Sequence, residues 1–108
     1  MTRKILHIYP ASIKEMEELG QRLKDARLRR RLSMEALCLR ADISRPTLYK
    51  VENGDPSVAF GIYVQVMSVL RLSEDLSLLA KEDRLGRQLQ DESLPRRKKV
   101  LRQKPAVE

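Results

Sequence analysis

The chain has 108 residues, with 22 Lys and Arg side chains against 15 Asp and Glu, which gives a formal charge of +7. This length allows one domain with a modest hydrophobic core, and the single cysteine excludes an intrachain disulfide. Aromatic residues make up 4% of the chain and Trp is absent, so the composition favours an all-α fold over a β-sandwich. The positive charge favours nucleic acid as the partner over an anionic membrane surface.

Residue types that catalysis and metal binding need are scarce. The chain has one His and one Cys, no glycine-rich phosphate loop and no pair of carboxylates in an apolar pattern, so we expect no enzyme, no cofactor and no metal site. Cys38 falls within an apolar pattern and is predicted to be a small packed residue. Because no signal peptide and no apolar run of about 18 residues is found, we expect a soluble protein, cytoplasmic or nucleoid-associated, with no membrane partner.

Residues 1–10 are predicted to form an N-terminal extension. The run from Thr2 to Pro10 is rich in Ile and Tyr and is the one segment with the character of a strand. A lone strand has no partner in the chain, so it would pair with a second copy across a two-fold axis, dock on another protein or stay flexible. We favour the pairing across the axis.

The segment from Ser12 to Arg31 is predicted to be an amphipathic helix, because its apolar residues recur every three or four positions. These residues are Met16, Leu19, Leu23 and Ala26. Glutamates near its start and arginines at its end suit the helix dipole. The alternative reason for Arg29 to Arg31 is contact with a DNA backbone.

The stretch from Ser33 to Gly54 predicts two short helices joined by a tight turn. Ser33 and Ser44 are expected to be the N-caps, and Pro46 lies in the first turn of the second helix, where proline loses no hydrogen bond. Asp42 tolerates the left-handed backbone that ends the first helix. A helical hairpin that only packs is the competing interpretation.

The outer face of the second short helix predicts a surface for base edges and phosphates, since it offers hydrogen-bond donors, one aromatic ring and a small apolar patch. The residues on this face are Arg45, Pro46, Thr47, Tyr49 and Lys50.

After Gly54 we expect further helices. The first is predicted from Val58 to Leu70 with Ser57 as its cap, and a buried strand at Ile62 to Val66 is the competing prediction. A second helix starts at Ser73. A short third one runs from Asp83 to Gln90. The leucines of the last two exceed what a small core needs, which indicates a dimer or partner contact or, alternatively, packing on the same subunit. The leucines assigned to this contact are Leu76, Leu79, Leu85 and Leu89.

These patterns predict a DNA-binding domain at residues 11–81, a short contact helix at 82–94 and a basic flexible tail at 95–108. Residues 92–108 contain six basic and two acidic side chains. This segment has almost nothing to bury, so it would attract phosphates, bind an acidic partner or keep the protein soluble.

From about Leu19 to Leu79 the chain resembles the five-helix, lambda-repressor-like DNA-binding domain of the Xre/Cro-type helix-turn-helix repressors. The resemblance lies in L-G-Q-R-L-K-D-A-R, in S-x-E-x-L and in I-S-R-P-T-L-Y-K-V-E-N-G. It implies a structural ion pair between Arg27 and Glu52. From their positions we expect contacts to DNA phosphates from Ser33, Ser44, Asn53 and the backbone at Met34, which would set the register without reading sequence. Met34 departs from the family, because many members have a Gln there.

A narrower resemblance concerns R-P-T-L-Y-K-V-E-N-G-D-P-S-V together with the leucine-rich helix, D-R-L-G-R and the basic tail. This combination is similar to HipB-type antitoxins that accompany HipA-type kinase toxins. It implies a homodimeric repressor that binds a palindromic operator, an inverted repeat in double-stranded DNA, regulates its own operon and holds the toxin in a complex. The alternatives are a stand-alone Xre-type regulator and a module that chiefly binds the toxin.

Overall fold

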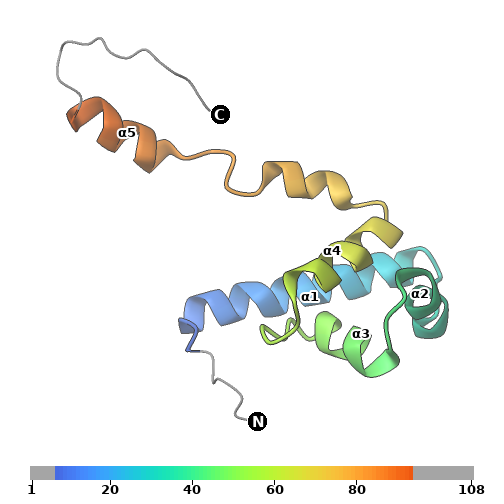
Figure 1. The fold of residues 1–108 in the computed structure, drawn as a ribbon. Coiled ribbons are helices and arrows are strands. Elements are labelled where there is room, and N and C mark those ends of the chain that lie inside the picture. Colours follow the sequence, from blue (N-terminus) through green and yellow to red (C-terminus); the bar gives the residue numbers. More distant parts are fainter. Residues whose placement is uncertain (1–6, 94–108) are drawn as a thin grey trace. The chain divides into compact units, whose positions relative to one another are not determined.

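The structure is a computed structural model that describes residues 7–93, and these residues form helices and loops without a strand. The predicted all-α fold is confirmed for this part of the chain. The helices are α1 (Pro10–Arg29), α2 (Met34–Ala41), α3 (Arg45–Glu52), α4 (Phe60–Val69), the 3₁₀ helix η1 (Ser73–Leu78) and α5 (Arg84–Ser93) (Figure 1). Most of the predicted strand and the whole basic tail lie outside the described residues, and residues 7–9 have no strand structure.

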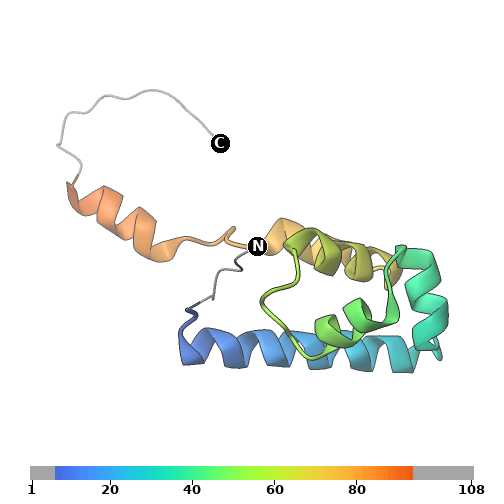
Figure 2. The ribbon, with the colours of Figure 1, turned by 60° about the horizontal axis from the view of Figure 1, so that its bottom comes forward.

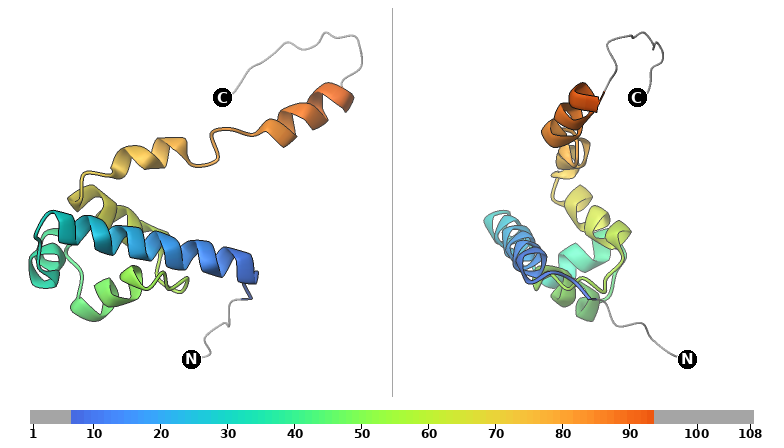
Figure 3. Two further views of the ribbon diagram at one scale, coloured as in Figure 1. Left: turned by 180° about the vertical axis from the view of Figure 1, so that it is seen from behind. Right: turned by 90° about the vertical axis from the view of Figure 1, so that its left-hand side faces the viewer.

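The chain divides into two compact units, Met1–Ser77 and Leu78–Glu108. In the first unit α3 packs on α1, and α2 packs on both α3 and α4. The views in Figures 2 and 3 agree that α2 lies beside the C-terminal end of α1. In the second unit, α5 is the main described element.

Several helix boundaries differ from the prediction. The first helix begins at Pro10 rather than Ser12, because proline at the first helical position needs no hydrogen-bond partner for its nitrogen. The fourth begins at Phe60 rather than Val58, since Ser57 bonds to Asp55 instead of capping it. The competing strand at residues 62–66 is wrong, because α4 covers this segment.

The hydrophobic core lies in the first unit and is formed by α1 to α4 with the first residue after α4. Met16 and Leu19 are partly buried against it. The predicted inward faces are therefore the faces that pack. The buried residues are Leu23, Ala26, Leu37, Cys38, Ala41, Leu48, Val51, Tyr63, Val66, Met67 and Leu70.

The turn between α2 and α3 has the predicted geometry. Asp42 is left-handed, with φ 58° and ψ 49°, and the backbone N–H of Ile43 donates to the Cys38 carbonyl at 3.1 Å. The Ser44 hydroxyl then accepts from the backbone N–H of Thr47 at 3.2 Å and caps α3. These local bonds set the entry of α3.

Two glycines allow α1 to approach the end of α3 closely. A Cβ atom on Gly20 would lie 2.5 Å from the backbone nitrogen of Gly54, and one on Gly54 would lie 2.2 Å from the Met16 carbonyl oxygen. Gly54 also has φ 71°, a conformation that other residues adopt only with strain. The backbones therefore meet without any side chain between them.

An ion pair fastens the same two helices. The Arg27 guanidinium donates from Nε to Glu52 Oε2 at 2.7 Å and from Nη2 to Oε1 at 3.2 Å. Its Nη1 donates to the Leu32 carbonyl at 2.9 Å. Both side chains are 7% exposed. The pair thus links α1, the loop before α2 and the last residue of α3.

The loop after α3 is held by Tyr63. Its hydroxyl donates to the Asp55 carbonyl at 2.8 Å. Burial, with a smaller contribution from the negative charge of Asp55, raises the pKa of Tyr63 to about 12. The neutral phenol is therefore the form that the fold requires.

The close approach of the two glycines predicts opposite effects of two matched substitutions. Gly20→Ala should destabilise the fold by about 1 to 3 kcal/mol, because the backbone of α3 must move. Gly61→Ala, where a Cβ would meet nothing within 4 Å, should be neutral or stabilise by up to about 1 kcal/mol. Urea denaturation of both variants measures the two values, and equal effects would contradict the packing argument.

The buried ion pair predicts strong coupling between its two residues. Arg27→Met or Glu52→Leu alone should cost about 3 to 5 kcal/mol, because each leaves a buried charge unpaired. The double variant should cost clearly less than the sum. The exposed pair Arg87 and Glu82, with 3.9 Å between Nη1 and Oε1, is the control and should contribute less than about 1 kcal/mol. Additive losses at Arg27 and Glu52 would show that they act independently.

Tyr63 predicts a stability loss at high pH. Since its pKa is about 12 in the fold and about 10 when unfolded, its contribution is fully present below about pH 10 and is lost as the pH rises toward 12. Tyr63→Phe should lower the free energy of unfolding by about 1 kcal/mol at neutral pH. Between about pH 10 and 12 the free energy of unfolding of the variant should then decrease less steeply than that of the unchanged protein. Parallel stability curves for the two proteins would contradict the assignment.

Candidate nucleic-acid interface

The helix α3 has two distinct faces. Leu48, Val51 and Glu52 are buried against the rest of the first unit. Arg45, Pro46, Tyr49 and Lys50 are exposed on the other side of the same helix. A helix of two turns that buries one side so completely presents the other as a rigid surface.

The exposed face of α3 is not flat. Arg45, Pro46, Tyr49 and Lys50 line an open hollow of about 360 Å³ together with Met34, the first residue of α2. Four of the five predicted base-reading residues therefore come together. Thr47 does not line the hollow; it is half-buried, and its hydroxyl lies 2.9 Å from that of Ser44.

The contribution of the Met34 side chain was missed in the sequence, where only its backbone was assigned a role. The structure shows its side chain partly buried against the core and also at the edge of the hollow. The family resemblance marked the position of Met34, where many members have a Gln, but an apolar residue there did not indicate where its side chain lies. Only the packing of α2 beside α3 brings it to this surface.

Side chains predicted to contact phosphates are first of all helix caps. The Ser33 hydroxyl accepts from the Ala36 N–H at 3.0 Å, and the Ser44 hydroxyl accepts from the Thr47 N–H at 3.2 Å. Asn53 donates from its side-chain nitrogen to the Tyr49 carbonyl at 3.0 Å. At the start of α2 the backbone N–H groups of Met34 and Glu35 have no partner within the helix, which is the arrangement that binds anions. At the start of α3 only the N–H of Arg45 is in this position, because Pro46 has no N–H and Thr47 donates to Ser44.

The arginines at the end of α1 were expected either to stabilise the helix end or to contact a DNA backbone. For Arg30 the structure supports the role at the helix end. Its guanidinium donates to the Ala26 carbonyl at 2.9 Å, so it caps the helix. Arg29 and Arg31 are exposed, and Arg31 has φ 56°, where α1 ends.

Cys38 is a packed residue rather than a reactive one. It is 7% exposed and belongs to the core. Burial raises the pKa of its thiol, although nearby Arg45 acts in the opposite direction. A thiol that stays protonated is a poor nucleophile.

The leucines assigned to a dimer or partner contact are distributed over both units. Leu76 is half-buried in the first unit. In the second unit Leu79, Leu85 and Leu89 are 60%, 66% and 54% exposed. The described part of the second unit thus presents apolar side chains to solvent.

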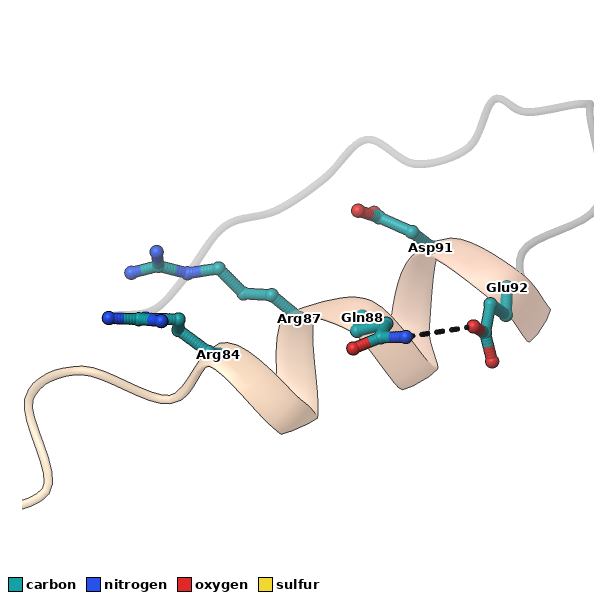
Figure 4. A pocket seen from close by; sticks show the side chains of 5 residues that line it. All are labelled: Arg84, Arg87, Gln88, Asp91 and Glu92. Atoms are coloured by element: carbon teal, nitrogen blue, oxygen red, sulfur yellow. Dashed lines mark hydrogen bonds between the residues drawn. The ribbon is translucent and has the colours of Figure 1, made fainter.

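Another face of α5 carries charges of both signs. Figure 4 shows Arg84 and Arg87 on its first turns and Asp91 and Glu92 near its end, with Gln88 between them. Gln88 donates to Glu92 at 3.2 Å. Basic residues at the start and acidic residues at the end oppose the helix dipole, whereas Asp83 accepts from the Gly86 N–H at 2.9 Å and suits it.

No helix within residues 7–93 has the length and apolar character needed to cross a membrane. No group of three or more His, Cys, Asp or Glu residues in the described part of the chain lies close enough together to hold a metal ion.

Comparison with known proteins gives the chain a family. The model of a helix-turn-helix domain matches residues 18–79, a range that covers α2, the turn at Asp42 and α3. No curated protein matches the chain. Because the matched range is more than half of the 108 residues, the chain belongs to the helix-turn-helix domain family of DNA-binding proteins, in its Xre-like form.

Proposed function

We propose that this protein is a sequence-specific transcriptional repressor that reads the major groove of DNA with the outer face of α3. The observation that carries this proposal is the division of α3 into a buried face and a face with Arg45, Tyr49 and Lys50 exposed. A helix held in this way fits the major groove, where each base pair presents a distinct pattern of donors and acceptors.

Arg45 is the first candidate for direct base readout. It is the first residue of α3 and is exposed, and a guanidinium can bind guanine O6 and N7 with two hydrogen bonds. Lys50 and Tyr49 lie about one turn further along and reach a neighbouring base edge or a phosphate. Thr47, half-buried beside Ser44, has the smaller role among the proposed reading residues.

Backbone contacts set the register of the protein on the duplex without reading sequence. The start of α2, after the Ser33 cap, has the free N–H groups of Met34 and Glu35, and the start of α3 adds the single free N–H of Arg45. Asn53 follows the last turn of α3 and is exposed. The excess positive charge adds attraction that depends on salt rather than on sequence.

The protein is proposed to act as a homodimer on an inverted repeat. A two-fold dimer places its two α3 helices in successive major grooves, about 34 Å apart, so the operator carries two half-sites at that spacing. The exposed leucines of the second unit, Leu79, Leu85 and Leu89, are the proposed dimer or partner contact together with Leu76. Burying them would remove apolar surface from water.

The biological setting we propose is a toxin-antitoxin operon, with the protein in the cytoplasm at the nucleoid. The support is the resemblance to HipB-type antitoxins, which implies autoregulation and a complex with a HipA-type kinase toxin. A stand-alone Xre-type regulator is the alternative within the same class.

A second candidate function is that of a module that chiefly binds the toxin. The exposed leucines and the charged face of α5 favour it, because neither is needed by the first unit. Deleting residues 82–108 separates the two candidates: it abolishes toxin binding and leaves operator affinity unchanged if this segment is chiefly the partner surface.

Arg45→Ala should weaken binding to a site selected from a random DNA library by about 1 to 3 kcal/mol and relax specificity at one base pair. Arg84→Ala, an exposed arginine of the second unit, is the control with the same loss of charge and should change affinity little and equally for all duplexes. Titrations against the selected site and a scrambled duplex, at two salt concentrations, give both quantities. If the two substitutions reduce binding to both duplexes alike, Arg45 does not read a base.

A further inference from the structure

We propose that α5 is a contact between two copies of this protein, which pair through this helix in antiparallel orientation. This inference rests on the proposed function and deepens it, because it names the surface that joins the two subunits of the repressor. The helix spans Arg84–Ser93 and lies outside residues 18–79, the range that the helix-turn-helix family model matches. The family match therefore assigns no role to it.

The first argument is that α5 has an unpacked surface on every side. None of its ten described residues is buried. An isolated helix of this length is only marginally stable in water, and helices in proteins gain most of their stability from packing an apolar face. A partner that covers one side of α5 would supply this packing.

The second argument is that one side of α5 is apolar. Leu85 and Leu89 are four residues apart, so they are neighbours on one face of the helix, and both are exposed. Arg87 lies midway between them in the sequence, which places it on the opposite side of the helix. The two leucines therefore offer a contact from which the side with Arg87 stays free.

The third argument is the order of the polar residues beside the leucines. Arg84, Gln88 and Glu92 follow one another at intervals of four residues and form one row along α5 (Figure 4). The last two members of this row come three residues after the two leucines, so the row borders the apolar side. It is positive at its start, uncharged in its middle and negative at its end.

A row with this order is complementary to its own reverse. In an antiparallel pair, Arg84 of each copy lies beside Glu92 of the other copy, and the two Gln88 side chains meet near the two-fold axis, where an amide both donates and accepts. Each basic start also lies beside the negative end of the other helix dipole. A parallel pair would instead bring like charges together.

Other occupants fit this surface less well. An anionic membrane surface would repel Asp91 and Glu92. A partner whose charge has one sign would leave one end of the row beside a like charge. A second copy of α5 complements both ends at once.

The test measures the dissociation constant of the full-length dimer by sedimentation equilibrium. Arg84→Glu should weaken the dimer about tenfold, because two ion pairs become two repulsive pairs. Adding Glu92→Arg to this variant restores opposite charges and should return the constant to near its original value. Arg87→Glu makes the same change of charge on the opposite side of α5, so it is the matched control and should change the constant by less than about twofold.

A second variant removes the apolar contact. Leu85→Ser together with Leu89→Ser should leave the protein monomeric over the same range of concentrations. Neither leucine belongs to the hydrophobic core, so the thermal unfolding of the first unit should be unchanged. Each variant is also titrated with the selected and the scrambled duplex.

The outcomes separate the two levels of the proposal. The α5 pair is overturned by an unchanged protein that stays monomeric, by a dimer that survives loss of both leucines, or by a dimer that responds alike to Arg84→Glu and Arg87→Glu. It is also overturned if the charge exchange fails to restore the dimer. Preference for the selected duplex in these cases leaves the DNA-reading proposal intact, and equal binding to both duplexes overturns that proposal.

Discussion

The buried ion pair between Arg27 and Glu52 is the constraint on which the position of the exposed face of α3 depends. An unpaired charge at either position would be costly in the core, so the two residues must meet, and their meeting sets where α3 lies on α1. The bond from Arg27 to the Leu32 carbonyl extends the same control to the loop before α2. Beside the pair, Gly20 and Gly54 let the backbones touch. The exposed face of α3 is therefore positioned through the buried face of the same helix, which packs on α1.

The helix α3 has an inner face that packs and an outer face that is exposed. Leu48, Val51 and Glu52 face the first unit, and Arg45, Tyr49 and Lys50 face solvent. This division explains why the outer residues can change without loss of the fold, since none of them belongs to the core. The hollow at Met34 is the exception, because it joins α2 to the surface of α3. The shape of this surface depends on how two helices pack, as well as on which residues α3 carries.

The second unit has a different physical character. Its described leucines are exposed, and one face of α5 carries two arginines and two acidic residues. Such a segment gains little from its own folding and more from what it contacts. The proposed DNA-reading residues and the proposed dimer or partner contact therefore lie mostly in different units of the chain.

The sequence by itself determined the helical class, the caps at Ser33 and Ser44, and the left-handed turn at Asp42, because these depend on residue periodicity and on bonds between near neighbours. It also marked four residues of the hollow, since they share one face of a short helix. Only the tertiary structure decided that Met34 lines the hollow, that Thr47 does not, and that α4 starts at Phe60. The place of Met34 depends on how α2 packs beside α3, and the places of Thr47 and of the start of α4 depend on which local hydrogen bonds form. Packing between distant segments and competition between hydrogen bonds leave no periodic signal in the sequence.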